Sequence, residues 1–310
     1  MMGHEHSLIR RILFATDFSK CAHHAEQYVT FLANVYGAAV HVVHVLEIYG
    51  GMYVPAILLE QRQRETAEQL TEVARRLTLP AGAVTHRPIS GIPSVLICEA
   101  AMGDNADLIV LGTRGRTGLE HILLGSTAER VLTMAPCPVL TIRETNGSEG
   151  PLQRKPIRFE QILVPTDFSD CSSDALEYGI QIVKAMSAHL TLLHVLEPVA
   201  YGMDLMLARA TERDQKIANE QMQALGSRIR AYGISVTETI RGGLPADSIV
   251  GLARGSNCDL IIMGTHGRRG VSRLFKGSVA EAVLRRASCP VLAVKGFKVP
   301  SGYQPVGSAP

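Results

Sequence analysis

The sequence predicts an α/β protein made of two tandem copies of one doubly wound, five-stranded parallel-sheet domain. Short runs of Ile, Leu and Val alternate with longer amphipathic segments, which is the order of a protein built from βαβ units. These runs are continuous rather than alternating, as in strands that are covered on both faces. The whole pattern occurs twice along 310 residues, a length that suits two domains.

Each half of the chain repeats the other. Residues 12–21 return 150 residues later as residues 162–171, and residues 107–113 return 152 residues later as residues 259–265. A period of this length matches a whole domain and is too long for a solenoid unit. We therefore expect each half to fold by itself.

Composition places the domain boundaries. The join between the halves is rich in Gly, Ser, Pro and charged residues and has almost no apolar residues, which is typical of an exposed linker. We expect a first domain at residues 1–146, a linker at 147–156, a second domain at 157–298 and a tail at 299–310.

The elements of the first half follow in order from its apolar runs. The run 12–15 predicts the first strand, and the segment 20–36 predicts a helix that ends at Gly37, because glycine is favoured just after a helix. The run 40–46 predicts the second strand. The alternation then continues through a helix over 56–77 stopped by Pro80, a strand near 84–89, a helix opened by Pro93, a strand over 108–111, a helix after Ser126 and a strand over 138–142.

Composition also limits the partners and the location. The 31 basic and 29 acidic residues give a net charge of +2, so no general field attracts nucleic acid or an anionic membrane, and we expect neither partner. No apolar run reaches the roughly 18 residues of a membrane span, and residues 1–7 lack the apolar core of a signal peptide. We expect a cytoplasmic protein, whose six scattered cysteines stay reduced.

A glycine motif follows the fourth strand of each half. Its pattern is G-x-x-G-x9-G-S, at Gly112, Gly115, Gly125 and Ser126 and again at Gly264, Gly267, Gly277 and Ser278. In open α/β sheets, ligands bind beyond the carboxyl ends of the strands. Glycines let the backbone approach a phosphate, and the start of a helix supplies free N–H groups. The motif therefore predicts a phosphate site, with a tight strand-to-helix loop as the alternative.

An aspartate follows the first strand of each half directly, at Asp17 and Asp167. A carboxylate at this edge can accept hydrogen bonds from ribose hydroxyls. The alternative is helix capping, by the aspartate itself or by Ser19 and Ser169.

Together these segments resemble the universal stress protein family. The resemblance rests on residues 162–169, 194–197 and 259–264 and on the glycine motif, and it covers both halves. It implies Rossmann-like sheets of strand order 3-2-1-4-5 and ATP held by the motif. Ala15 departs from the proline that is usual at its place. Carried across residue by residue, the first site comprises Ala15, Thr16, Asp17, Val45, Leu111, Gly112, Arg114, Gly115, Gly125, Ser126 and Thr127, and the second comprises Pro165, Thr166, Asp167, Val195, Met263, Gly264, His266, Gly267, Gly277, Ser278 and Val279.

We expect an ATP-binding regulatory protein of the stress response, with or without magnesium beside the adenine nucleotide. The alternative is an enzyme on the same fold that hydrolyses ATP slowly or transfers an adenylyl group. The motif lacks the lysine of a Walker loop, so we expect no catalytic residues. We expect the halves to pair as an intramolecular pseudo-dimer through strands 138–142 and 290–294, which hides two apolar edges; a homodimer is a further option.

The two glycine loops differ in charge. Between its second and third glycines the first loop has Arg116 and His121 opposed by Glu120, whereas the second has no acid and four basic residues, Arg268, Arg269, Arg273 and Lys276. We include Arg116 and Arg268 among the binding residues and expect the second site to bind phosphate more tightly.

The histidines, the cysteines and two further segments do not by themselves predict a metal site or a catalytic site. His41 and His44 lie three apart on one strand and so face opposite sides of the sheet, and we expect no metal site. Cys137 and Cys289 each precede a proline, where a core role and redox sensing are both open. Residues 49–53 and 200–203 are either lids over the nucleotide or plain connectors.

Overall fold

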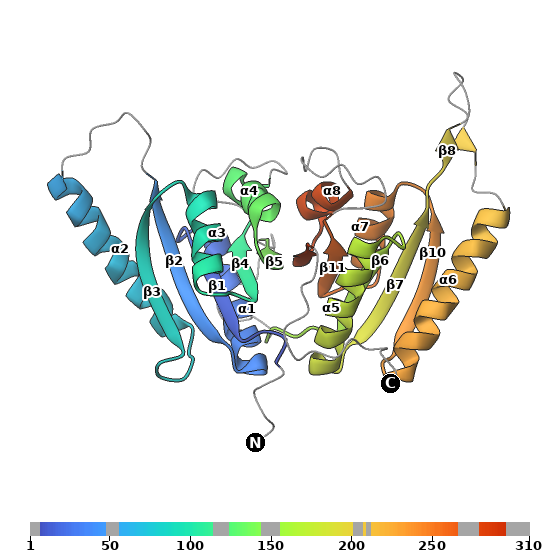
Figure 1. Ribbon diagram of the computed structural model, residues 1–310, viewed down its shortest axis with the longest axis horizontal. Coiled ribbons are helices and arrows are strands. Elements are labelled where there is room, and N and C mark those ends of the chain that lie inside the picture. The colour runs from blue at the N-terminus through green and yellow to red at the C-terminus, as the bar shows by residue number, and fades with distance from the viewer. Residues whose placement is uncertain are drawn as a thin grey trace. The chain divides into compact units, whose positions relative to one another are not determined.

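The computed structural model describes residues 7–47, 56–113, 124–143, 156–200, 207–208, 212–265 and 279–295. The chain divides into two compact units, residues 1–157 and 158–310, and each unit alternates strands and helices (Figure 1). Within the described residues, no helix combines the length and apolar character needed to cross a membrane.

The described residues of the first unit form five parallel strands and four helices. The strands are β1 (Arg11–Ala15), β2 (Ala39–Glu47), β3 (Val84–Gly91), β4 (Leu108–Gly112) and β5 (Val139–Ile142). The helices are α1 (Lys20–Tyr36), α2 (Ala56–Arg76), α3 (Pro93–Gly103) and α4 (Ser126–Met134). Every predicted element is present, and β3 continues two residues beyond its predicted end.

The described residues of the second unit repeat this order and include a short antiparallel strand pair that the sequence did not predict. The strands of its sheet are β6 (Gln161–Thr166), β7 (His189–Leu196), β10 (Val236–Gly242), β11 (Leu260–Gly264) and β12 (Val291–Val294), and the antiparallel pair joins β8 (Val199–Ala200) to β9 (Leu207–Ala208). The helices are α5 (Asp170–Met186), α6 (Glu212–Ala231), α7 (Pro245–Gly255) and α8 (Val279–Arg286).

The strand order confirms the prediction. The first unit has the order β3-β2-β1-β4-β5, and the second has β10-β7-β6-β11-β12, so both follow 3-2-1-4-5. The chain moves from β1 outward to β3 and then crosses back to β4. Strand order therefore reverses between β1 and β4, where Ala15 lies opposite Leu111. A ligand site is expected at the carboxyl ends of these two strands.

Helices cover both faces of each sheet. In the first unit, α1 and α2 share one face, because Thr30 on α1 donates to the carbonyl of Leu77 just after α2, and α3 and α4 pack together on the other. The central strands are accordingly buried, with Leu13 and Phe14 at 0% exposure. This explains why their sequences are continuous apolar runs.

Candidate functional site

The turn after β1 is held by its own side chains. The Thr16 hydroxyl accepts a hydrogen bond from the Phe18 N–H at 3.1 Å, and Oδ1 of Asp17 accepts one from the Ser19 N–H at 3.0 Å. Ser19 then caps α1 by accepting from the Ala22 N–H. The capping role considered for Ser19 is confirmed, and Asp17 is left at the carboxyl edge of the sheet with one oxygen bound to the turn.

The second unit builds the same turn. The Thr166 hydroxyl accepts from the Phe168 N–H at 3.0 Å, and Oδ1 of Asp167 accepts from the Ser169 N–H at 3.1 Å. The bonds agree although Ala15 of the first unit stands where the second has Pro165. The missing proline therefore does not change the exit from the first strand.

The first motif glycine has a packing role. A Cβ on Gly112 would lie 3.1 Å from Sγ of Cys21 and 3.2 Å from the Ala22 nitrogen, at the start of α1. The equivalent Gly264 is tighter still, with a Cβ only 2.8 Å from the carbonyl oxygen of Cys171. These two glycines therefore let the start of a helix approach the end of a strand, whereas most of the loop between the motif glycines lies outside the described residues.

The third motif glycine starts α4. The Gly125 N–H donates to the Thr113 carbonyl at 2.8 Å, which ties the helix start to the residue after β4. Gly125 is the N-cap and no side chain caps the helix, while Ser126 is its first residue. Because Gly125 has no side chain, the N-cap residue offers no acceptor to the first amides of α4, which suits an anion site at a helix N-terminus.

The remaining described site residues surround this edge with apolar surface. Ala15, Val45 and Leu111 are at most 9% exposed in the first unit, and Met263 is 5% exposed in the second. Val195 is half-buried, and Val279 begins α8. Thr127 follows Ser126 in the first turn of α4. The other predicted binding residues lie outside the described residues: Arg114, Gly115, Arg116, His266, Gly267, Arg268, Gly277 and Ser278.

Two aromatic pairs at this edge were not among the predicted site residues. The ring of Phe18 lies against that of His44 with centroids 4.5 Å apart, and Phe168 lies against His194 at 4.4 Å. Their recurrence at matching places in the two halves is the signal that marks them in the sequence.

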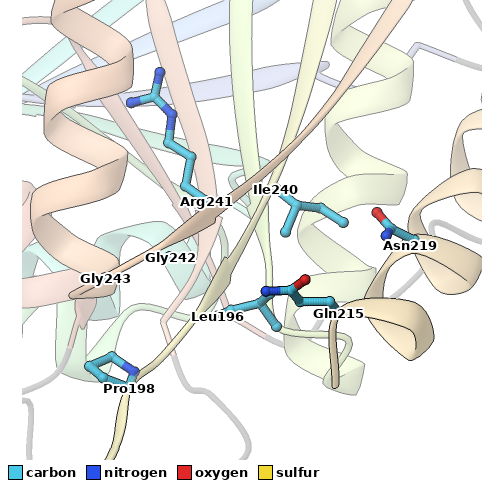
Figure 2. A pocket seen from close by; sticks show the side chains of 8 residues that line it. All are labelled: Leu196, Pro198, Gln215, Asn219, Ile240, Arg241, Gly242 and Gly243. Atoms are coloured by element: carbon cyan, nitrogen blue, oxygen red, sulfur yellow. The ribbon is translucent and has the colours of Figure 1, made fainter. Parts of the chain in front are cut away.

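A groove of about 490 Å³ opens at the carboxyl ends of β7 and β10 in the second unit. Figure 2 shows Gln215 and Asn219 of α6 on the side of β10 that carries Ile240, with Arg241 on the opposite side. In the first unit, Gln63 donates to Ser90 at 3.5 Å; at the place of Ser90 the second unit has Gly242. The hydrogen bond of Gln63 to Ser90 in the first unit therefore has no counterpart at Gly242, which has no side chain.

The histidines of β2 do face opposite sides. Nδ1 of His41 bonds Asp104 after α3, whereas Nδ1 of His44 bonds the Thr16 carbonyl. In the part of the chain that the structure describes, no cluster of three or more His, Cys, Asp or Glu side chains is arranged to hold a metal.

The cysteines considered for redox sensing are poorly suited to it. Burial raises the pKa of the Cys137 thiol to about 12, and burial likewise raises the pKa of Cys289 to about 12. Reactive cysteines need the opposite shift, so these thiols have the character of core residues.

Comparison with known proteins identifies the family. The model of the universal stress protein family matches residues 8–143 and 158–295. A universal stress protein of Methanocaldococcus jannaschii is 33% identical over 141 residues, which is 44% of this chain and 82% of that protein. The crystal structure of a universal stress protein from Archaeoglobus fulgidus has 26% identity and a TM-score of 0.68, and the match covers 92% of this chain and 96% of the other. A functionally unknown protein from Pseudomonas aeruginosa, at 18% identity and a TM-score of 0.62 over 93% of this chain and 92% of its own, shares the fold. The chain therefore belongs to the universal stress protein family, with one family domain in each half.

Proposed function

We propose that each unit binds ATP at the carboxyl edge of its sheet, with or without magnesium, and that the chain is an ATP-binding regulatory protein of the stress response. One observation carries the proposal: α4 begins without a side-chain cap, tied to the residue after β4, at the point where strand order reverses. Uncapped helix amides bind phosphate. The Asp17 turn on the neighbouring strand supplies the acceptor that ribose hydroxyls require.

The motif residues outside the described ranges belong to the same proposal. Arg114, Arg116 and Arg268 add positive charge to the loops that lead to the helix starts, and His266 adds a hydrogen-bond donor there; charge-assisted contacts with phosphate are the strong ones. We further propose that the protein acts in the cytoplasm, with the two units paired as a pseudo-dimer.

A regulatory role differs from catalysis in what happens to the bound nucleotide. Hydrolysis requires an oriented water and metal-bridged phosphates. A regulator instead holds ATP intact, and the bound nucleotide changes its stability or its choice of partner.

Calorimetric titration of the full chain with ATP tests the proposal. Replacing both aspartates (Asp17→Asn with Asp167→Asn) should weaken ATP binding about tenfold, because each site loses the charge-assisted hydrogen bond between its carboxylate and the ribose. Asparagine keeps an oxygen for the turn bond from Ser19 or Ser169, so the fold is retained. Glu99→Gln on the exposed side of α3 is the matched control and should leave the affinity unchanged.

Incubation with ATP and magnesium then separates the two functions. ATP that stays intact on the protein over hours supports the regulatory role. Multiple turnovers would favour the slow hydrolase, and a wild-type chain that does not bind ATP would contradict both.

A further inference from the structure

Each unit holds one phenylalanine in a backbone conformation that L-residues rarely adopt. Phe18 and Phe168 both have φ of 61°, in the left-handed region that normally favours glycine. The same strain at the same place in both halves requires surroundings that over-determine it, and such positions cluster at functional sites. Each phenylalanine directly follows the aspartate of the candidate site.

A buried histidine holds this conformation in place. Nδ1 of His44 bonds the Thr16 carbonyl at 2.7 Å, and the ring lies against Phe18 at an interplanar angle of 32°. Because a carbonyl only accepts, Nδ1 carries the hydrogen and the orientation of the ring is set. His44 is 8% exposed. His44 therefore fixes both neighbours of Asp17: it bonds the carbonyl of Thr16 and packs against the ring of Phe18.

The second unit repeats the arrangement. Nδ1 of His194 bonds the Thr166 carbonyl at 2.8 Å, its ring lies against Phe168 at 34°, and it is also 8% exposed. In both units, a buried histidine and a phenylalanine in the left-handed region therefore flank the aspartate of the candidate site.

We propose that His44 and His194 are positioning residues that set the selectivity of each site for ribose over deoxyribose. The inference rests on the proposed function, since the aspartate must meet a nucleotide. With Thr16 and Phe18 fixed, Oδ1 of Asp17 accepts the hydrogen bond from the Ser19 N–H, and we assign Oδ2 as the oxygen that accepts from the sugar hydroxyls. Loss of the histidine frees the turn, and the carboxylate no longer meets the sugar hydroxyls in one geometry.

The test measures sugar selectivity in a full chain that retains one site. Gly277→Val removes the second site, and the dissociation constants for ATP, 2′-deoxy-ATP and 3′-deoxy-ATP are measured on this parent. We expect the parent to prefer ATP over one deoxy analogue about tenfold, the effect of one charge-assisted hydrogen bond. His44→Leu should raise the dissociation constant for ATP about tenfold and change that for the deoxy analogue by less than about twofold. The preference for ATP then disappears.

Two further variants separate positioning from folding. Phe18→Gly suits the left-handed backbone but removes the ring contact, so it should fold normally and also lose the preference. His44→Asn places an amide donor near the position of Nδ1 and should restore part of the preference. The proposal would be overturned if His44→Leu weakened the binding of ATP and of its deoxy analogues equally. It would also be overturned if both His44→Leu and Phe18→Gly kept the preference for ATP. A parent chain that binds no ATP would overturn the proposed function as well.

Discussion

The guanidinium of Arg76, at the end of α2, donates hydrogen bonds from Nε and Nη2 to the two carboxylate oxygens of Glu26 on α1, at 2.8 and 2.7 Å. Glu26 is 5% exposed, and its hydrogen bond to Arg76 raises the pKa of that guanidinium. A carboxylate this far from water depends on its partner. The pair joins the two helices that cover one face of the first sheet.

Arg76→Met should lower the free energy of unfolding by about 2 kcal/mol, because it leaves the Glu26 charge buried with its main partner gone. The expected loss is below that of a fully buried pair, since the Arg76 side chain is 37% exposed. Arg228→Met is the matched control in the second unit, where the partner Glu177 has 22% side-chain exposure against 7% for Glu26, and it should cost less than about 1 kcal/mol. Urea unfolding of both variants measures the difference, and equal losses would contradict the prediction.

Gly226→Ala should destabilise α6 although alanine normally stabilises a helix interior. A Cβ at Gly226 would overlap the Glu238 carboxylate of β10, which Arg230 holds at 2.5 Å. We expect a loss of about 1 kcal/mol where the helix preference alone would give a gain of about that size. In a Glu238→Ala background the same change should be stabilising. Gly251→Ala in α7, where a Cβ would meet nothing within 4 Å, is the control. If thermal or urea unfolding shows Gly226→Ala to be as stabilising as Gly251→Ala, the packing argument is wrong.

The buried thiols should make the protein less stable in alkali. Burial raises the pKa of the Cys289 thiol in the folded protein to about 12, from 9.0 for an unperturbed thiol. As pH rises, the thiol ionises first in the unfolded chain. The contribution of the buried, neutral thiol to the free energy of unfolding is therefore complete below about pH 9. It is lost as pH rises toward 12, by at most about 1.4 kcal/mol per pH unit. Cys289→Ala should flatten this decline in urea unfolding measured between pH 8 and 10. A slope equal to that of the wild type would exclude Cys289 as a source.

The two nucleotide sites should differ in affinity. The second glycine loop has Arg268, Arg269, Arg273 and Lys276 with no acid, and one additional charge-assisted phosphate contact separates the affinities about tenfold. Calorimetry on two single-site chains measures this. The Gly125→Val chain keeps only the second site, and the Gly277→Val chain keeps only the first. The Gly125→Val chain should bind ATP more tightly, and its affinity should fall more steeply with salt. Equal affinities with equal salt slopes would show that these basic side chains serve another surface.

The last strand of each half is predicted to pair with the other. Residues 138–142 and 290–294 are apolar, and pairing hides edges that otherwise expose backbone groups. Each half, expressed alone, should therefore self-associate through this strand and protect its amides from hydrogen exchange. Monomeric halves with rapid exchange at 139–142 would contradict the arrangement.

The sequence by itself determined the fold class, the duplication and the edge of the sheet on which the candidate site residues lie. Continuous runs such as 108–111 mark strands buried on both faces, and Gly112 and Asp17 are placed at one edge merely by following such runs directly. These are local signals, because strand type and carboxyl-end position depend on residues adjacent in the chain. The family resemblance rested on the same segments.

Only the tertiary structure decided what individual residues do. Gly112 allows the close approach of α1, Gly125 takes the N-cap position before Ser126, and Nδ1 of His44 bonds the carbonyl of Thr16, 28 residues away. Each role depends on an atom brought close by strand pairing or helix packing. Such contacts leave no periodic trace in the sequence, because a side chain's partner is set by the register of a neighbouring strand and by the path of the chain between them.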